Sequence, residues 1–487
     1  MSHQFKPYDR DQQFLLPPSL RDWLPAGDLA YFIVDVVEEL DLSEIYEYYS
    51  VAEDEVSKRK RRKASSGQPA FHPKMMVGLI LYAYCNGTPS SRKIARLCER
   101  DAGYRIVSAE QGPNFRTISE FRRIHLKALK GLFVQVLQLA REAGLVKLGH
   151  VALDGTKVKA NASKHKAMSY VRMLEKEAEY ARQVEELLKR AESVDEEEDR
   201  LYGKDLRGDE LPEELRFREK RLAKIREAKK ALEEQAKAKA RAEGKLDAKG
   251  NPKPPKRGRA PKTPPGTPKP KDQRNFTDPE SGIMKMGNGS FDQAYNCQAA
   301  VDSQAQIIVA RRVTREANDK QQLKPMVEQM KSNLAEKPMR AETAKANAGH
   351  GKREKREKGD HKPAKPREFS ADSGYYSEDN VTYLQGEGID DYVHPDRVKH
   401  GEELPQVRGR IPKDISFINR VRRKLLTKKG RQRYGLRKET AEPVFGQMKL
   451  CRGLVQFLLR GREKVDGEWS LWCTGHNLLK LWATSVA

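Results

Sequence analysis

The sequence has few cysteines for its length and no long apolar segment. Only five cysteines occur in 487 residues, and no two of them form a CxxC pair. This scarcity disfavours a disulfide framework and a zinc site of the usual spacing. No apolar run of about 18 residues, the length needed to span a membrane, is present, and the first residues, MSHQFKPYDRDQQ, contain no apolar signal region. We therefore expect a cytoplasmic protein that makes no contact with a membrane.

Acidic residues are also comparatively scarce. Asp and Glu total 70 against 94 Lys and Arg, which gives a net charge of +24. A charge of this size and sign favours a polyanionic partner, nucleic acid first, although a merely soluble basic protein is the plainer alternative. The phosphate-binding pattern GxxxxGK[ST] is absent as well, so the sequence does not indicate an ATPase of that class.

Composition changes several times along the chain, and a chain of this length predicts two to four domains. Charge runs and proline-rich stretches mark the boundaries. The predicted segments are an N-terminal segment (1–63), a helical DNA-binding domain (64–145), the first part of a catalytic core (146–163), a charged helical arm (164–247), a Pro/Lys-rich disordered linker (248–272), the continued core (273–338), a basic low-complexity insertion (339–367), and the end of the core with C-terminal helices (368–487).

The domain at 64–145 reads as three helices separated by short turns. They are FHPKMMVGLILYAYCNG, SSRKIARLCERDAG and RTISEFRRIHLKALKGLFVQVLQLAREAG, the last beginning with a capping box of Thr117 and Glu120. Arginines on the second and third helices favour a helix-turn-helix-like DNA-binding module, while an ordinary helical bundle with a basic face is the alternative. The DNA contacts predicted from this domain are Arg92, Arg96, Arg122 and Arg123.

The charged arm at 164–247 has narrow apolar stripes at spacings of three and four residues. This pattern predicts a helical hairpin or coiled coil, broken by GKDLRGDELPEE. A solvated arm without chemistry of its own is the plainer alternative. The linker that follows holds eight prolines and eight Lys or Arg between residues 248 and 271, which cannot build a core.

The remaining segments alternate between strand-like and helical patterns. The run VAL at 151–153 ends on Asp154, and AYNCQAAVDS with QIIVARRVT indicates a hairpin. A helix within 318–334, a strand ending on Asp372, a helix at 378–388, the strand DDYVHP and terminal helices follow. With the arm removed, this is the element order of a ribonuclease H-like fold. We therefore predict an α/β core, α+β overall, with the arm inserted between its first and second strands.

Three acids stand at the ends of these predicted core elements: Asp154, Asp372 and Glu442. In a ribonuclease H-like sheet the first and fourth strands are neighbours and the last helix crosses them, so the three carboxylates would converge. Hard oxygen ligands select Mg²⁺ or Mn²⁺, and two such ions suit phosphodiester chemistry. Taken singly, each acid could be an ordinary turn or surface residue, and Glu439 competes with Glu442. Gly155 and Gly374 are expected to leave room for the substrate.

The helix that carries Glu442 follows a strongly basic run. Residues 420–438 contain ten Lys or Arg and no acid, so they are expected to lead a DNA backbone toward Glu442. Lys449 lies seven residues after Glu442 and points the same way on a helix, where it can hold a phosphate.

At this point the chain resembles a DDE-type insertion-sequence transposase of bacteria. The blocks that carry the resemblance are FHPKMMVGLILYAYCNG…SSRKIARLC…RTISEFR, LDGTKVKANAS, NFTDPESGIMK…YNCQAAVDSQAQIIVA, ADSGYYS, YGLRKETAEPVFGQMK and GLVQFLLRGREKVDGEWSLWCTGHNLLKL. The resemblance implies that Asp154, Asp372 and Glu442 form a catalytic triad that binds two divalent ions, and that water and then a 3′-hydroxyl attack phosphodiester bonds.

The related signature is Tyr, two residues, Arg, three residues, Glu, six residues, Lys. Tyr434 and Arg437 match its first interval, and Glu442 and Lys449 match its last. Four residues separate Arg437 from Glu442, so Lys438 has the correct distance to Glu442 but not to Tyr434. All of these basic and tyrosine positions are candidate DNA contacts.

The resemblance also implies the partners. They are double-stranded DNA, as the terminal inverted repeats of the element and as target, and a second copy of the chain as a homodimer in the DNA complex, within the bacterial cytoplasm and its nucleoid. A catalytically inactive, transposase-derived DNA-binding protein is the main alternative. A basic RNA-associated or scaffolding protein is a third, which predicts no metal site.

Overall fold

The computed structural model describes residues 19–50, 70–202, 213–247, 250–253, 263–335, 365–395, 407–412 and 414–486. Helices and one mixed sheet make up this part of the chain, so the fold is α+β. Within the same residues, every helix is too short or too polar to cross a membrane. All five cysteines are free, and every one except Cys451 is buried. The predicted low-complexity insertion at 339–367 lies almost wholly outside the described residues.

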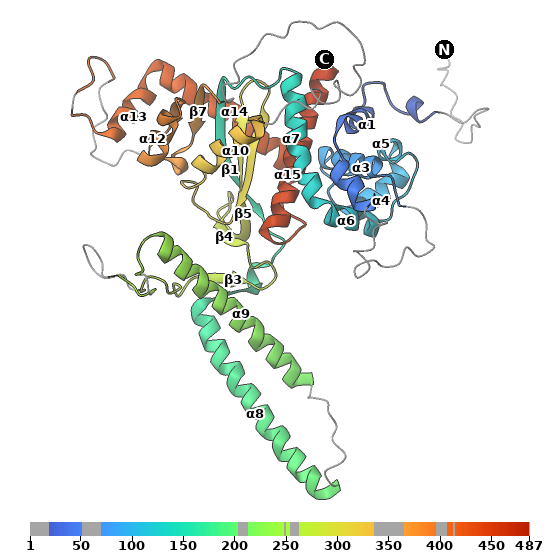
Figure 1. Cartoon of the computed structure of the whole chain (residues 1–487), viewed down its shortest axis with the longest axis vertical. Helices are drawn as coiled ribbons and strands as arrows, with labels where there is room; N and C mark the ends of the chain where they lie inside the picture. Colours follow the sequence, from blue (N-terminus) through green and yellow to red (C-terminus); the bar gives the residue numbers. More distant parts are fainter. Residues whose placement is uncertain are drawn as a thin grey trace, which may run out of the picture.

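The described residues before 143 are helical apart from short connections, and they gather on one side of the molecule (Figure 1). Pro73 opens its helix as predicted, because proline suits the first helical turn. The elements are η1 (Leu20–Asp22), α1 (Leu29–Glu39), α2 (Ser43–Ser50), α3 (Pro73–Cys85), α4 (Ser91–Arg100), α5 (Ala102–Val107), α6 (Phe115–Ile124) and α7 (Leu126–Glu142).

The third helix predicted for this region is in fact two helices, α6 and α7, which meet at His125. Asn114 caps α6: its Oδ1 accepts hydrogen bonds from the backbone N–H groups of Arg116 and Thr117, both at 2.9 Å. The predicted capping box is therefore wrong. Asparagine is a stronger N-cap than threonine, so the helix begins earlier than the Thr117–Glu120 pattern suggests.

A six-stranded sheet forms the centre of the molecule. Its strands lie in the order β4-β5-β1-β7-β8, and β6 pairs with the same edge of β5 as β4 does. β5 is antiparallel to β1, β4 and β6, whereas β1, β7 and β8 are parallel. The strands are β1 (His150–Lys159), β4 (Gly282–Lys285), β5 (Phe291–Asp302), β6 (Ile307–Thr314), β7 (Glu368–Ala371) and β8 (Asp390–Val393).

The predicted order of the main elements is confirmed. The hairpin is β5 and β6, and the two following helices are α10 (Leu323–Ala335) and α12 (Glu378–Gly386). Strands β2 (Ala167–Ser169), β3 (Gln273–Asn275) and β4 were not predicted. They have three or four residues each, too few to show an alternating pattern.

The first core strand is longer than predicted. β1 does not end on Asp154 but continues to Lys159. It pairs with β5 from Val151 to Lys159, which is nearly its whole length. The apolar run stops at Leu153 because only this first half also has β7 as a neighbour and is fully buried. A strand that loses one neighbour becomes half-exposed, so polar residues enter its pattern without ending it.

The long helix α15 (Arg462–Ser485) joins the sheet to the N-terminal helices. It runs beside α7, contacts α3 and β6, and is buried along most of its length (Figure 1). Trp469 and Trp472 are fully buried in it, and the Trp469 indole donates a hydrogen bond to the carbonyl of Gln298 on β5. One hydrophobic cluster contains residues of the N-terminal helices, the sheet and α15. These parts are therefore packed as one body.

The charged arm projects away from this body as two long helices, α8 (Tyr170–Tyr202) and α9 (Glu213–Ala242), which lie side by side (Figure 1). Near its root, Met173 and Ile225 are buried against each other's helix, and Glu177 pairs with Lys229 at 2.6 Å. The predicted break falls between the two helices, and residues 203–212 lie outside the described ranges. The two-stranded sheet of β2 and β3 closes the root of the arm.

Candidate active site

Two of the three predicted acids come from neighbouring parallel strands. Leu153 of β1 is in register with Ala371 of β7, and both strands pass directly from this pair to an acid, Asp154 and Asp372. In a parallel pair, the residues that directly follow two paired positions lie side by side on the two chains. The Asp154 and Asp372 side chains are therefore neighbours. Asp372 also accepts a hydrogen bond from the backbone N–H of Gly374 at 2.9 Å, which orients its carboxylate.

The third acid is brought to Asp154 by an arginine. The helix α14 (Lys428–Gly446) packs across β1, and Arg437 donates from Nη1 to Asp154 Oδ2 at 3.0 Å and from Nη2 to Glu442 Oε1 at 3.2 Å. Of the two candidate glutamates, Glu439 and Glu442, it is therefore Glu442 that binds the same arginine as Asp154. α14 leads into a short π-helix at Gln447–Cys451, after a proline within its last turn.

The electrostatics of the site are set by burial. Burial raises the pKa of Asp154 from 3.8 to about 6, and the neighbouring Asp372 and Glu442 add to this increase, while Arg437 opposes it. Burial alone would lower the pKa of Arg437, but the attraction of the three carboxylates more than reverses this effect. Burial therefore disfavours the ionised form of Asp154, and a positive charge beside this carboxylate is needed to stabilise it.

The donor chemistry of the site fits a divalent cation. Asp154, Asp372 and Glu442 offer only carboxylate oxygens, the hard ligands that Mg²⁺ and Mn²⁺ prefer. In the arrangement described here Arg437 supplies the positive charge between Asp154 and Glu442. Accordingly, among the described residues no three His, Cys, Asp or Glu side chains stand close enough together to hold a metal ion as they are.

The role expected for Gly155 is wrong. A Cβ on this residue would lie 2.5 Å from Gln298 Nε2 and 3.1 Å from both Asn296 Oδ1 and the Tyr375 hydroxyl. Successive residues of a strand face opposite sides of the sheet, so these groups pack under Gly155 on the face opposite Asp154. The glycine therefore makes room for three buried protein side chains and not for a substrate.

These buried side chains belong to a polar network that sequence reasoning missed. Gln298 is fully buried, accepts a hydrogen bond from the Tyr375 hydroxyl, and donates to Asn296 Oδ1 at 3.0 Å and to Asp319 Oδ1 at 2.8 Å. Asn296 donates to the same Asp319 oxygen at 2.7 Å. A usable signal was present for the amides, because Asn296 and Gln298 alternate with Tyr295, Cys297 and Ala299 along β5. Asp319 lies in a turn without any periodic pattern.

The remaining residues predicted around Glu442 lie close to the site, in different environments. Lys449 is half-buried and donates from Nζ to the carbonyl of Lys157 on β1 at 2.9 Å. Tyr434 packs against Arg437, whose guanidinium lies 5.9 Å from the ring centroid. Lys438 is exposed. Lys449 thus reaches the outer end of the strand that carries Asp154.

The basic run at 420–438 is only partly available to a ligand, which corrects the expectation that it lines a DNA path throughout. Arg422 and Arg423 are buried, and Lys424 pairs with Asp390 at 2.7 Å. The basic residues of the run that remain exposed are Arg420, Lys428, Lys429, Arg431 and Lys438. The inward-facing half of the run is used in tertiary contacts, because α14 packs against the sheet and α13 (Phe417–Leu426) packs against α14.

Of the four N-terminal arginines predicted to contact DNA, three are exposed and one is not. Arg92 and Arg96 lie on the outer face of α4, and Arg123 is exposed beside Glu120. Arg122 is buried, and its guanidinium donates to the carbonyl of Pro89 at 2.7 Å and to Ser91 Oγ at 3.2 Å. The expectation for Arg122 is therefore wrong: its hydrogen bonds tie α6 to the start of α4.

We expect Arg122→Met to lower the free energy of unfolding by about 2–4 kcal/mol, because it removes charge-assisted hydrogen bonds inside the fold. Urea titrations followed by tryptophan fluorescence measure this loss. The matched variant Arg96→Met, on the exposed face of α4, should change stability by less than about 0.5 kcal/mol. Equal losses in the two variants would contradict the structural role of Arg122.

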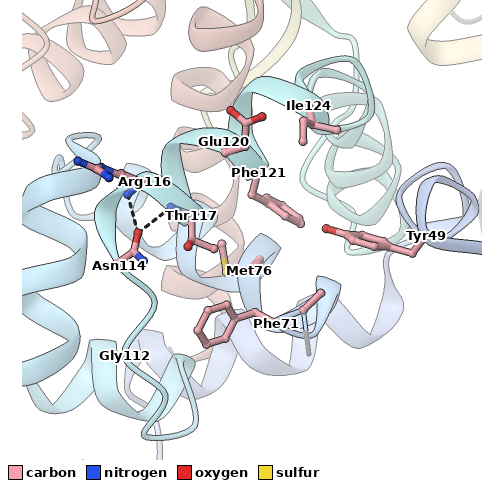
Figure 2. A pocket seen from close by; sticks show the side chains of 11 residues that line it. Tyr49, Phe71, Met76, Gly112, Asn114, Arg116, Thr117, Glu120, Phe121 and Ile124 are labelled. Atoms are coloured by element: carbon pink, nitrogen blue, oxygen red, sulfur yellow. Dashed lines mark hydrogen bonds between the residues drawn. The ribbon is translucent and has the colours of Figure 1, made fainter. Parts of the chain in front are cut away.

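A separate pocket of about 650 Å³ opens among the N-terminal helices, away from the acids (Figure 2). Aromatic and apolar side chains, including Tyr49, Phe71 and Phe121, form much of its wall, with Thr117 and Glu120 among the polar residues. Figure 2 also shows the capping hydrogen bonds of Asn114 at one side of the pocket. The polar side chain of Asn114 is thus committed to the helix start.

Two segments of the chain are similar to known protein families. Residues 410–482, which include α13, α14 and most of α15, match the family described as Transposase DDE domain. Residues 18–123 match the family described as Transposase domain (DUF772). Comparisons with curated proteins and with solved structures gave no match.

Both matched families are transposase families, and their segments contain the two parts of the chain identified above from the residues themselves. The first lies in the N-terminal helices, and the second contains Arg437, Glu442 and Lys449. Together they show that the chain has two segments similar to transposase domains, one of which is described as a DDE domain.

Proposed function

We propose that this protein catalyses metal-dependent hydrolysis and strand transfer of phosphodiester bonds at the ends of an insertion sequence. One observation carries the proposal: Asp154 and Asp372 follow a registered pair on adjacent parallel strands, and Arg437 joins Asp154 to Glu442. Three acids from distant parts of the chain thus act on one guanidinium group, that of Arg437. The transposase families matched at both ends of the chain support the same reaction.

The sheet supports a ribonuclease H-like core for this reaction. Its main strands lie in the order β6-β5-β1-β7-β8, with β5 antiparallel to β1, and the arm is inserted after the first strand. We propose that residues 146–163, 273–338 and 368–487 form this core, that residues 64–145 bind DNA and that the arm is a separate insertion. In such a sheet, the edge at Asp154 is where a substrate reaches all three acids.

Asp154, Asp372 and Glu442 would hold two divalent ions, Mg²⁺ or Mn²⁺. When bound, these ions activate the attacking oxygen and stabilise the leaving oxygen of an in-line displacement. The protein groups prepare the site for them. Asp154 is held ionised by Arg437 despite its burial, and the hydrogen bond from Gly374 orients Asp372. Moving Arg437 from the carboxylates to a DNA phosphate would free those oxygens and place its charge on the substrate.

Exposed cations on two faces suit the proposed DNA substrate. Arg92, Arg96 and Arg123 lie on the N-terminal helices, and Lys438 extends from the α14 that carries Glu442. Lys449, Arg437 and Tyr434 stand nearest the acids. Such cations bind duplex phosphates without regard to sequence and give a strong salt dependence. We propose that two copies of the chain act on the paired ends of the element, in the bacterial cytoplasm at the nucleoid, with the arm contributing to dimerisation.

A cleavage assay tests the proposed function. The substrate is a labelled duplex carrying the inverted repeat that flanks the gene, incubated with Mg²⁺, Mn²⁺ or EDTA. We expect nicking at the repeat end with either ion and none with EDTA. Glu442→Gln should reduce the rate at least about a thousandfold, whereas Glu439→Gln should leave it within about threefold.

DNA binding in the same variants separates the possible outcomes. Retained binding by Glu442→Gln without cleavage supports a role in the chemistry. Full cleavage by this variant, together with loss by Glu439→Gln, would move the third acid to position 439. Specific binding by the wild type with no cleavage under any condition would favour the inactive, transposase-derived DNA-binding protein.

A further inference from the structure

A fourth carboxylate stands next to Asp372. A Cβ built on Gly374 would lie 3.0 Å from Asp372 Oδ1 and 3.4 Å from Asp319 Oδ2, so the two acids face each other across this glycine. Asp319 comes from the turn before α10, 53 residues before Asp372 in the chain. Two carboxylates this close repel each other unless a cation lies beside them.

Asp319 cannot relieve this repulsion by turning away, because its other oxygen is clamped. Oδ1 accepts hydrogen bonds from the side-chain amides of Asn296 at 2.7 Å and Gln298 at 2.8 Å. Gln298 is itself fully buried and is held on its other side by Tyr375. The clamp directs Oδ2 toward the Asp372–Gly374 turn.

The clamp is built into the sheet that carries the active-site acids. Gln298 and Asn296 lie opposite Gly155 and Lys157 of β1, so the strand that carries Asp154 also fixes the distance to the clamp. Burial raises the pKa of Asp319, and the nearby charge of Asp372 adds to this increase, whereas the hydrogen bonds from Asn296 and Gln298 and the charge of Lys157 oppose it.

We propose that Asp319 is a positioning residue of the active site, which adds a fixed negative charge beside Asp372 and thereby strengthens the binding of a divalent cation there. This inference rests on the proposed function. Asp319 itself acts through Asp372. Charged partners placed outside the ligand set commonly change metal affinity by about 10–100-fold.

Two variants of the full chain separate charge from shape. Asp319→Asn keeps an oxygen for both amides but loses the charge, whereas Asp319→Glu keeps the charge and changes the shape. Mn²⁺ binding is measured by isothermal titration calorimetry, without DNA. We expect Asp319→Asn to raise the Kd for Mn²⁺ about 10–100-fold, and Asp319→Glu to raise it less. Asp379→Asn, which removes the same charge from the exposed face of α12, should leave the Kd within about twofold.

The outcomes distinguish this inference from the proposed function. An unchanged Kd in Asp319→Asn, while Asp372→Ala loses Mn²⁺ binding, overturns the inference and leaves the proposed function standing. A larger loss in Asp319→Glu than in Asp319→Asn also overturns it, because shape and not charge would then decide. Failure of the wild type to bind Mn²⁺ overturns both. Thermal unfolding of each variant checks that the fold is intact.

Discussion

Asp154→Asn should reduce cleavage of the element end at least about a thousandfold while leaving DNA binding within about threefold. The side chain keeps its size, so packing against α14 is preserved, but the neutral amide cannot act as an anionic ligand. Of its two ion pairs, Arg437 then keeps only the one with Glu442. Single-turnover cleavage and a filter-binding titration measure the two effects. Wild-type cleavage by this variant would remove Asp154 from the reaction.

The same variant should be more stable than the wild type at high pH. Burial raises the pKa of Asp154 to about 6 from 3.8, so above pH 6 the folded wild type holds an ionised group that would be better solvated when unfolded. This net effect corresponds to up to about 3 kcal/mol and already includes the attraction of Arg437. As the pH falls from about 6 to 4, the folded carboxyl takes up a proton and the difference shrinks.

Urea unfolding of both proteins at pH 8 and pH 4.5 measures this difference. We expect Asp154→Asn to gain stability over the wild type at pH 8 and to lose most of that gain at pH 4.5. Asp379→Asn, on an exposed helix face, serves as the control and should differ little from the wild type at either pH. A variant less stable at pH 8 would show that the ion pair with Arg437 outweighs the effect of burial.

Gly155→Ala is expected to have the second largest effect, by lowering the free energy of unfolding by about 2–3 kcal/mol and cleavage by at least about tenfold. The added methyl group would meet Gln298 Nε2 at 2.5 Å, and this amide cannot move aside because it is fully buried and bonded to Asn296 and Asp319. β1 must shift instead, which moves Asp154 relative to Asp372.

Gly149→Ala is the matched control, because it lies just before the same strand and its Cβ would meet no atom within 4 Å. This variant should change stability by less than about 0.5 kcal/mol and leave cleavage unchanged. Thermal unfolding and the end-cleavage assay measure both effects. If Gly155→Ala behaved like Gly149→Ala, the side chains packed against Gly155 would be able to move aside for the methyl group, and they would not set the position of β1.

Much of the fold could be predicted from local patterns. The hairpin of β5 and β6 shows strand-like runs on both sides of a short turn, and α3 and α12 have clear stop signals. Two wrongly predicted element boundaries have identifiable physical causes. Polar residues begin at Asp154 and predict the end of β1 there, whereas the strand only loses β7 as a neighbour. The start of α6 depends on Asn114, a stronger cap three residues before Thr117.

The predicted roles of charged residues were less dependable than the predicted elements. Arg122 and Arg96 look alike in the sequence, yet one is buried against Pro89 and Ser91 and the other is exposed. Helical spacing shows which residues share a face but not which face another helix covers. The same limit explains why half of the basic run at 420–438 turned out to be used inside the protein.

The sequence by itself was enough to predict a DDE-type transposase and three candidate acids, because the DDE-like blocks keep their residues and order along the chain. It was also enough to predict a polyanionic partner, since net charge needs no structure to be counted. Only the tertiary structure decided that Arg437 joins Asp154 to Glu442, that Gly155 covers a buried network, and that Asp319 stands beside Asp372. The physical reason is that all of these contacts except the one between Arg437 and Glu442 join residues separated by 53 to 283 positions, and strand register and helix packing, not local pattern, set such distances.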